Sequence, residues 1–319
     1  MNSLNVVEAG PEHAEQVVSV IHRSFGARRV LDPPTSALDE TTESVAQVLA
    51  RSGGLLVERR GKPVGAMLFD ESRPGSMGFT RVSVDPDVQN RGIASAMVGV
   101  SEDIAEERGM DGIWLHAREE LPDMVEFWSH RKYIPVSQEG TLIEFGKTLW
   151  LARELPDVAA TRAFSEHLAG LLQAGDVLVM TGGLGAGKTT FTQGLGDALG
   201  VRGPITSPTF VIARTHPSLV AGPPLVHVDA YRLGASLELD DIDLDATTEE
   251  SVTVVEWGEG MAEQLSDNWL EIRLEQRHAV STDPLGTKVE GSGDDTRVIT
   301  VKPHGPRWVG VPLRSTLLV

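Results

Sequence analysis

The sequence predicts an α/β protein made of two domains, and three observations support this fold class. The chain has 319 residues, which is more than one domain usually holds. Four apolar residues, Val177–Met180, predict a buried strand that leads into a glycine-rich turn and then a helical pattern. A second strand–loop–helix unit joins the strand Met77–Val84 to a helix that starts near Ile93. Alternation of strands with helices is typical of α/β domains.

Composition narrows the classes of function. The net charge is −18, which argues against a protein that coats nucleic acid by itself, so contact with RNA is expected to be local or supplied by a partner. The absence of cysteine excludes disulfides, thiolate metal sites and a cysteine nucleophile. The first residues lack the basic and apolar regions of a signal peptide, and no apolar run could span a bilayer. We therefore expect a cytoplasmic protein without membrane contact.

The first half of the chain predicts a regular series of elements. Pro11 opens the first helix, because the N–H that proline lacks has no partner at that position anyway. In chain order we expect a strand at Leu4–Glu8, a helix that starts at Pro11, a loop at Gly26–Asp39, a helix at Thr41–Arg51, a hairpin of Gly54–Arg59 with Pro63–Phe69 that turns at Gly61-Lys62, and the strand Met77–Val84.

The loop after Val84 predicts a first anion site. Asp85-Pro86 breaks the strand, and Gln89-Asn90-Arg91-Gly92-Ile93-Ala94 leads into the next helix. Backbone N–H groups of Arg91 to Ala94 would point at a pyrophosphate, and Arg91 would add charge. The loop lacks the lysine-threonine pair that a γ-phosphate and magnesium require. An ordinary helix start remains the alternative for so short a pattern.

The order of elements around this loop resembles the GNAT acetyltransferase superfamily. Gln89-x-x-Gly92-x-Ala94 is similar to that family's acetyl-CoA pyrophosphate loop, and the resemblance covers residues 4–147. It is carried further by a strand at Gly112–His116, by a helix at Leu121–Arg131 and by the strand that follows. The resemblance implies a mixed-sheet domain that binds acetyl-CoA through Val84, Gln89, Arg91, Gly92, Ile93 and Ala94.

Departures from the family pattern concern catalysis. The family's frequent tyrosine, proposed as a general acid, falls at Trp128, and an indole cannot deliver a proton in that way. Lys132 stands where the family has a glycine. A base for an acceptor amine could be Glu58, Glu71, His116 or Glu119, and the sequence does not choose among them. The alternative is a degenerate acetyltransferase fold kept as an interaction module.

The boundary between the domains is predicted near Thr148. Thr141–Thr148 reads as the last strand of the first domain and Leu149–Leu155 as the first strand of the second, so the domains are 1–148 and 149–319. Asp157 is the expected N-cap of a helix over Val158–Gln173. A later helix, Thr189–Leu199, contains Gly194 and Gly196, which weaken a helix locally.

The second glycine-rich loop fits the complete phosphate-loop template. Gly182-x-x-x-x-Gly187-Lys188-Thr189 lies where a strand turns into a helix. Glycines let the backbone N–H groups turn inward around an anion, and the helix dipole adds positive charge. Lys188 is expected to reach the β- and γ-phosphates of ATP, and the Thr189 hydroxyl to ligate Mg²⁺. The predicted nucleotide-binding residues of the loop are Gly182, Gly183, Leu184, Gly185, Ala186, Gly187, Lys188, Thr189 and Thr190.

Three later segments add chemistry to this loop. Hydroxyls of Thr206–Phe210 could meet the γ-phosphate, or this segment is an ordinary Ser-Pro turn. Asp229, at the end of the strand that begins at Val226, could hold Mg²⁺ or orient water, or could pair with Arg232. Glu256 ends an apolar strand as a Walker B carboxylate does, and Trp257 either flanks the nucleotide or packs in the core.

Together these segments closely resemble the TsaE-type ATPases of bacterial tRNA threonylcarbamoyladenosine synthesis. GGLGAGKTTF, TSPTF, HVDAYRL and VEW occur in that family's order and spacing over residues 150–310. Thr161 corresponds to a family threonine near the nucleotide, and Gly183 replaces a usual acidic residue without an expected loss of binding. The resemblance implies a P-loop NTPase α/β domain in which Lys188, Asp229 and Glu256 are catalytic and Thr189, Glu256 and Asp229 hold the metal.

The resemblance also implies partners. The expected ones are the other subunits of the tRNA threonylcarbamoyl-transferase complex, with tRNA contacted only indirectly. Two alternatives remain: an acetyl-CoA-dependent N-acetyltransferase with a protein or amine acceptor and a regulatory ATPase domain, or a nucleotide-gated scaffold. Closing strands are expected at Leu270–Leu274 and Arg297–Val301, and residues after His304 carry no informative pattern.

Overall fold

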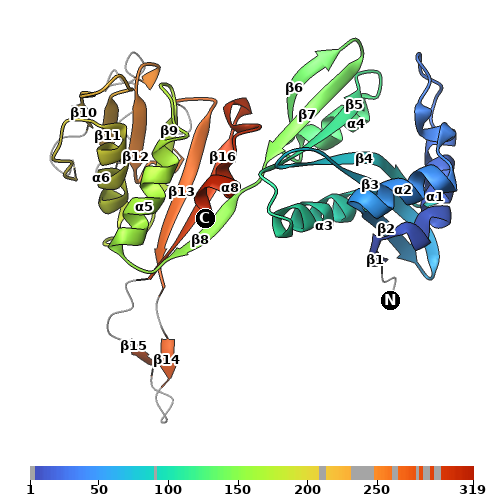
Figure 1. Ribbon diagram of the computed structural model, residues 1–319, viewed down its shortest axis with the longest axis horizontal. Helices are drawn as coiled ribbons and strands as arrows, with labels where there is room; N and C mark the ends of the chain where they lie inside the picture. The colour runs from blue at the N-terminus through green and yellow to red at the C-terminus, as the bar shows by residue number, and fades with distance from the viewer. Residues whose placement is uncertain are drawn as a thin grey trace. The chain divides into compact units, whose positions relative to one another are not determined.

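The computed structural model describes residues 4–89, 92–207, 213–230, 248–260, 265–277, 280–282, 288–290 and 296–319. The chain divides into two compact units, Met1–Leu149 and Trp150–Val319. The two are described separately below, and Figure 1 labels the elements of each.

The N-terminal unit is a mixed sheet with helices on both faces. Its seven strands have the order β1-β2-β3-β4-β5-β7-β6, with β4 and β5 parallel and the other neighbours antiparallel. The elements are β1 (Leu4–Ala9), α1 (Ala14–Gly26), α2 (Thr42–Ser52), β2 (Gly54–Arg59), β3 (Lys62–Arg73), β4 (Ser76–Val84), α3 (Ile93–Glu107), β5 (Gly112–Arg118), α4 (Pro122–Ser129), β6 (Ile134–Glu139) and β7 (Leu142–Thr148).

Strand β2 shows why both faces of this sheet need cover. Successive strand residues point to opposite faces. Accordingly Leu55 and Val57 pack into the core under α3 and α4, whereas Leu56 packs into the core under α1 and α2 (Figure 1). The predicted elements of this half are all present. The hairpin turn is displaced by one residue: Arg60 and Gly61 take positive φ, and Lys62 already belongs to β3.

The C-terminal unit is built on a sheet with the strand order β10-β11-β12-β9-β13-β16-β8. Strands β11, β12, β9 and β13 are parallel to one another, and antiparallel pairs close both edges. The elements are β8 (Leu151–Leu155), α5 (Val158–Ala169), β9 (Val177–Thr181), α6 (Lys188–Leu199), β10 (Ala213–His216), β11 (Leu225–Asp229), β12 (Val252–Glu256), β13 (Trp269–Gln276), the pair β14 (Val280–Thr282) and β15 (Lys288–Glu290), β16 (Arg297–His304) and α8 (Leu313–Leu317).

The central strands are buried along their whole length, as their unbroken apolar runs predict. Helices α5 and α6 cover one face, where Phe164 and Phe191 pack with Leu178 and Met180 of β9. Val177 and Val179 of the same strand face the other side. This arrangement places the carboxyl ends of β9, β11 and β12 at one edge of the sheet, where open α/β sheets bind ligands.

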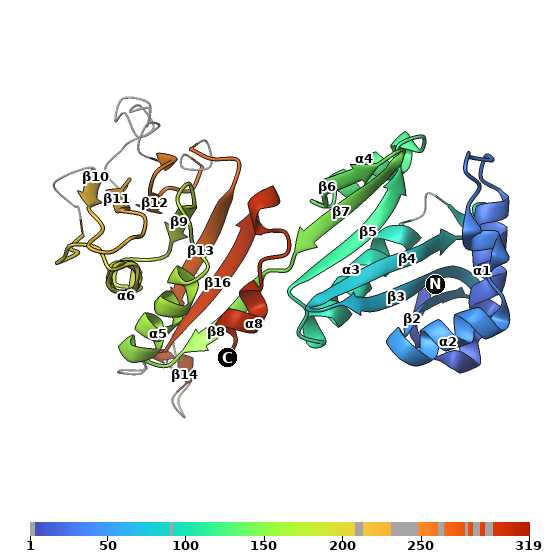
Figure 2. The ribbon, with the colours of Figure 1, turned by 45° about the horizontal axis from the view of Figure 1, so that its top comes forward.

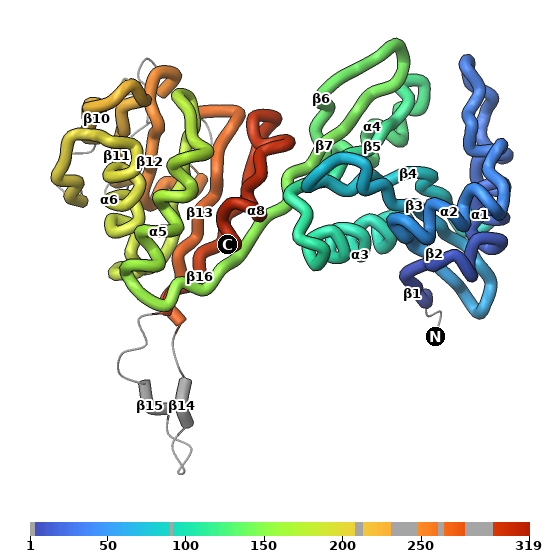
Figure 3. Tube along the Cα trace, in the orientation of Figure 1, coloured from blue at the N-terminus to red at the C-terminus, as the bar shows by residue number. Residues whose placement is uncertain are grey.

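The C-terminal segment differs most from what the sequence suggests. Trp308, Leu313 and Leu317 are fully buried in the main core, and α8 lies beside α5 (Figure 3). The predicted helix Val158–Gln173 stops at Ala169, and the Leu171 carbonyl beyond its end accepts a hydrogen bond from Arg307. Asp157 caps that helix as expected, since its carboxylate accepts from Ala160 N at 2.7 Å. Within the described ranges, no helix has the length and apolar character needed to cross a membrane.

Glycine 194 allows α5 and α6 to approach closely. A Cβ at this position would lie 2.2 Å from Ser165 Oγ and 3.1 Å from Arg162 Cα, whereas a Cβ on Gly99 in α3 would meet nothing within 4 Å. Gly194→Ala is therefore expected to destabilise the protein by about 1–3 kcal/mol through overpacking. Gly99→Ala, the matched control, should stabilise it by about 0.5–1 kcal/mol. Thermal unfolding of both variants measures these changes in stability. Equal shifts of the same sign in the unfolding temperature would contradict the overpacking argument.

Candidate functional site

The loop between β9 and α6 has the conformation of an anion cradle. Gly182, Gly185 and Gly187 have φ values of 143°, 76° and 105°, in the range that favours glycine. Gly187 is the N-cap of α6, and the first turn carries neither a side-chain cap nor an acidic residue. The N–H groups of that turn, together with the helix dipole, thus face the place where an anion would bind.

Two neighbouring glycines of the loop differ in the space around them. A Cβ on Gly182 would lie 2.2 Å from the carbonyl oxygen of Leu274 in β13, so a side chain there is excluded. A Cβ on Gly183 would meet nothing within 4 Å, and its φ is not positive. Only Gly182 is required by packing, and this agrees with the expectation that Gly183 can replace an acidic residue.

Lys188 folds back over the loop. Its Nζ donates to the carbonyl oxygens of Gly182 at 2.8 Å and Gly183 at 3.1 Å, and it lies 3.7 Å from the ring centroid of Trp257. Burial lowers the pKa of Lys188, and the carboxylates of Glu256 and Asp229 act in the opposite direction. The arrangement places a buried ammonium at the mouth of the anion cradle, with Trp257 against it.

Two carboxylates converge beside the helix start. Asp229 and Glu256 are register partners at the ends of the parallel strands β11 and β12, and both are more than nine-tenths buried. The Thr189 hydroxyl donates to Glu256 Oε1 at 3.2 Å. The structure thus brings Thr189, Glu256 and the strand end of Asp229 together from segments far apart in the sequence.

The donor set fits magnesium in the manner of a nucleotide site. No group of three or more His, Asp or Glu side chains in the described residues could hold a metal ion by itself. Mg²⁺ commonly binds through one or two protein oxygens, with water and substrate phosphates completing its octahedron. The hydroxyl of Thr189 and the carboxylates of Glu256 and Asp229 are ligands of that kind.

Other predicted residues of this site have varied surroundings. Leu184 is 96% exposed at the loop tip, Ala186 is buried, and Thr190 is half-buried in the first turn of α6. Thr161 is buried and donates its hydroxyl to the Asp157 carbonyl, so its role toward a nucleotide stays a prediction. Thr206 and Ser207 are described, whereas 208–212 and the Arg232 considered as a partner of Asp229 lie outside the described residues.

Sequence reasoning missed Arg297 near this loop. Its Nε lies 3.9 Å from the position that a Cβ on Gly187 would take. The pairing of Arg297 with Leu155 and Gln276 at the end of β16 brings it there. No local motif surrounds Arg297 in the sequence, so only the strand pairing could reveal it.

The predicted anion loop of the N-terminal unit also precedes a helix. Gly92 has φ 77° and is the N-cap of α3, whose first turn has no acidic residue and no side-chain cap. Ile93 points into the core, Ala94 is half-buried, and the Gln89 side chain donates to the Val84 carbonyl at 3.5 Å. Arg91 lies outside the described residues. The N–H groups at the start of α3 remain available to an anion.

Strands β4 and β5 separate at the same end of the sheet. They pair only from Ser76 with Gly112 to Phe79 with Leu115 and then diverge (Figure 2). The pairing of β4 with β3 shifts between Thr80 and Ser83, and Arg81 within this bulge has φ 52°. Unpaired main chain on both sides of such a wedge can hold an extended ligand.

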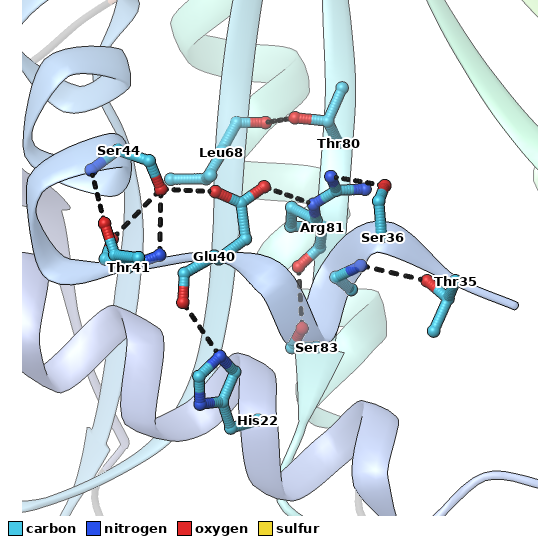
Figure 4. A network of polar contacts seen from close by, with 11 residues as sticks. His22, Thr35, Ser36, Glu40, Thr41, Ser44, Leu68, Thr80, Arg81 and Ser83 are labelled. Atoms are coloured by element: carbon cyan, nitrogen blue, oxygen red, sulfur yellow. Dashed lines mark hydrogen bonds and ion pairs between the residues drawn. The ribbon is translucent and has the colours of Figure 1, made fainter.

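A polar network anchors Arg81 (Figure 4). The Arg81 guanidinium donates to the Glu40 carboxylate at 2.8 Å and to Ser36 Oγ at 3.1 Å. Ser44 Oγ donates to the other Glu40 oxygen at 2.7 Å, and His22 Nε2 lies 3.0 Å from the Glu40 carbonyl oxygen. These contacts tie the loop before α2 to the bulge of β4, which no local pattern in the sequence indicates.

Among the four candidate bases, three have structural partners away from the wedge. Glu58 accepts from Asn5, Glu71 from Arg108, and Glu119 from Gln138. His116 lies on β5 just beyond its last residue paired with β4, and its Nε2 is 3.4 Å from Glu144 Oε2. Arg73 holds Glu144 through two bonds of 2.8 Å. Of the four candidate bases, His116 is therefore the one that lies beside the wedge.

The two departures from the acetyltransferase pattern lie in different surroundings, since Trp128 is in the core and Lys132 is exposed. Trp128 is buried and packs edge-on against Phe127 and Tyr133. The Tyr133 hydroxyl donates to Glu102 at 2.8 Å, and burial raises its pKa well above the ordinary value. Lys132 takes a φ of 65°, where the family has glycine. An indole at position 128 cannot donate a proton as a general acid, and the Tyr133 hydroxyl is engaged with Glu102.

The C-terminal unit has the features of the phosphate-loop class of α/β domains. These features are a parallel strand, a glycine loop with positive φ, a helix that begins with lysine and threonine, and a neighbouring strand that ends in a carboxylate. The family model "Threonylcarbamoyl adenosine biosynthesis protein TsaE" matches residues 155–283 of the chain. The tRNA threonylcarbamoyladenosine biosynthesis protein TsaE of Streptomyces coelicolor is 52% identical over 46% of this chain and 93% of its own length. That of Mycobacterium tuberculosis H37Rv is 52% identical over 38% of this chain and 77% of its own length. The chain belongs to the TsaE family through its C-terminal unit.

The N-terminal unit is similar to a second family. The model "Acetyltransferase (GNAT) family" matches residues 23–133. A solved structure of the PaiA N-acetyltransferase from Thermoplasma acidophilum in complex with coenzyme A is 12% identical, covers 46% of this chain and 99% of its own, and has a TM-score of 0.41. The assignment of a GNAT-like domain rests on the family model and on the mixed sheet of this unit.

The two adjacent glycines allow a matched test of the loop. Gly182→Ala would add about 1–3 kcal/mol of strain and is expected to weaken ATP binding at least about tenfold. Gly183→Ala should leave the affinity within about twofold, because its Cβ would meet open space. Calorimetric titration of ATP measures both, and equal losses in the two variants would contradict the packing argument.

The Glu40 network predicts a pH dependence of stability. Burial raises the pKa of Glu40, but the hydrogen bonds from Ser44 and Arg81 outweigh it, so its pKa lies below the ordinary value. A lowered carboxyl pKa stabilises the fold above the unfolded-state pKa, and this stability is lost as the pH falls through the folded-state pKa. Glu40→Gln should therefore lower the unfolding temperature near neutral pH and differ less from wild type at about pH 3. Calorimetry of the full chain measures the difference in unfolding temperature between the variant and the wild type at each pH. A difference that does not change with pH would contradict the stabilising role of the Glu40 carboxylate.

Proposed function

We propose that the C-terminal unit is a Mg²⁺-dependent ATPase required for threonylcarbamoyl modification of the tRNA adenosine next to the anticodon. The observation that carries the proposal is the meeting of Lys188, Thr189 and Glu256 at the helix start, with Asp229 beside Glu256. Membership of the TsaE family supports the role in tRNA modification.

Each residue has a task in this proposal. The loop N–H groups and Lys188 bind the β- and γ-phosphates and neutralise charge that develops on the γ-phosphoryl oxygens. Thr189, Glu256 and Asp229 would hold Mg²⁺, which would offset the negative charge of the phosphates. Asp229, whose carboxylate lies beside Glu256, would also orient the attacking water in line with the leaving oxygen. Trp257 flanks the nucleotide, and Arg297 adds a cation near Gly187.

The partners in this proposal are proteins. A chain with a net charge of −18 is poorly suited to bind tRNA directly. The ATPase is proposed to act on the other subunits of the tRNA threonylcarbamoyl-transferase complex in the cytoplasm, and to meet tRNA only through them. Leu184, which is exposed at the tip of the nucleotide loop, is proposed to contact such a subunit.

Lys188→Ala tests both halves of the proposal. Loss of the buried ammonium should reduce ATP turnover by about 100-fold or more. In cells that lack their own TsaE, the wild-type chain should restore threonylcarbamoyladenosine, measured by nucleoside mass spectrometry, and the variant should not. Lys302→Ala, which removes an exposed ammonium paired with Glu271, is the control. Unchanged turnover in the Lys188 variant would refute the site.

A second activity, acetyl transfer from acetyl-CoA to an amine, is favoured by the wedge between β4 and β5. In this proposal the start of α3 binds the pyrophosphate of the cofactor. The unpaired main chain near Val84 holds the pantetheine, and His116 takes the proton of the acceptor ammonium.

His116→Ala should reduce acetylation of a panel of primary amines and N-terminal peptides by about 10²–10⁴-fold. Binding of acetyl-CoA should remain unchanged, because the pyrophosphate site is separate. His130→Ala removes a 72% exposed histidine side chain and is the matched control. If acetyl-CoA binds and no acceptor is acetylated by the wild type, the unit is a sensor. If acetyl-CoA does not bind, the unit is a scaffold.

A further inference from the structure

A buried histidine of β11 has no role in the function proposed above. His227 is fully buried, and its Nε2 lies 2.9 Å from Glu256 Oε1. Glu256 itself has a side chain that is only 4% exposed. A hydrogen bond of this length between two buried side chains fixes both rotamers, because neither can exchange its partner for water.

The same carboxylate oxygen serves two donors. Glu256 Oε1 accepts from the Thr189 hydroxyl at 3.2 Å and faces His227 Nε2 at 2.9 Å. A hydroxyl can donate its proton to a carboxylate while an oxygen lone pair faces a cation. The bond to Thr189 is therefore compatible with a metal on Thr189, and His227 keeps Glu256 aimed at that hydroxyl.

The strand register explains how His227 reaches this position. His227 and Asp229 lie on the same face of β11, and Asp229 is the register partner of Glu256. His227 pairs with Val254, two register pairs before Asp229 and Glu256, so it approaches Glu256 from further back along the sheet than the strand end. It can orient the carboxylate without occupying the place of the phosphates.

The other ring nitrogen argues against a purely structural role. His227 Nδ1 is buried and has no hydrogen-bond partner among the described residues. A buried polar atom without a partner is unfavourable for folding. An apolar side chain of similar size would avoid that cost, so packing alone does not account for a histidine here, and the Nε2–H toward Glu256 is the group that does.

We infer that His227 is a positioning residue for the metal site: its Nε2–H holds Glu256 in the orientation that Thr189 and a nucleotide-bound divalent cation need. The inference rests on the proposed function, because it assigns His227 to the same Mg²⁺–nucleotide site. His227 touches neither the nucleotide nor the cation in this assignment, and it acts only through Glu256.

The test measures cation affinity rather than turnover. The full chain is loaded with a non-hydrolysable ATP analogue and titrated with Mn²⁺, followed by electron paramagnetic resonance. His227→Phe, which removes the donor and keeps the bulk, should weaken Mn²⁺ binding by about 10- to 100-fold. His227→Gln, which can still donate toward Glu256, should recover most of the affinity. Thermal unfolding of His227→Phe measures separately the cost of leaving the buried Glu256 carboxylate with one donor fewer, which the Mn²⁺ affinity of the folded variant does not include. Should this variant not fold, His227→Asn, too short to reach Glu256, replaces it.

A double-mutant cycle shows whether the effect passes through Glu256. In a Glu256→Gln background, His227→Phe should have little further effect on Mn²⁺ affinity, because the carboxylate that it positions is already gone. A loss of equal size in both backgrounds would overturn the inference. So would wild-type affinity in His227→Phe alongside weakened binding in Glu256→Gln. If Lys188→Ala and Glu256→Gln both bind the analogue and Mn²⁺ like the wild type, the proposed function fails, and the role of His227 fails with it.

Discussion

The approach of Gly182 to the Leu274 carbonyl is the constraint on which the C-terminal site depends. Strands β9 and β13 pair in parallel up to Arg273 and Thr181, and the chain must then turn across the end of β13. Space for that turn exists only without a side chain at position 182. The turn aims the loop N–H groups inward and starts α6 at Lys188, which sets the positions of Lys188 and Thr189.

Charge balance then explains the burial around this loop. One ammonium and two carboxylates lie beside each other, each more than nine-tenths buried, in Lys188, Asp229 and Glu256. Isolated charges would be too costly there, so hydrogen bonds from Thr189 and His227 and the carbonyls beneath Lys188 satisfy them. One of these donors, the Thr189 hydroxyl, is also a proposed ligand of an ATP-bound cation. The contacts that stabilise the buried charges and the proposed metal site therefore share a residue at this edge of the sheet.

The two units share one local device at the start of a helix. Both place a left-handed glycine, Gly92 or Gly187, as the N-cap of a helix whose first turn has no acidic residue. Helix α6 begins with a lysine and a threonine and lies beside two strands that end in carboxylates, and this set of groups suits a triphosphate with a cation. Helix α3 adds none of these and lies at the end of the sheet where β4 and β5 separate, which suits a pyrophosphate with an extended chain attached.

The sequence by itself determined the local elements, because periodicity, caps and glycine spacing act within a few residues. The strand–loop–helix units, the N-cap Asp157, the strand ending in Glu256 and both family resemblances were readable for that reason. Tertiary structure alone decided which distant residues meet. Arg297 near Gly187, His227 against Glu256, Glu40 against Arg81, and the burial of Trp308 all depend on strand order and register, which no local pattern encodes. The position of His116 just beyond the last pair of β4 and β5 likewise depends on strand register.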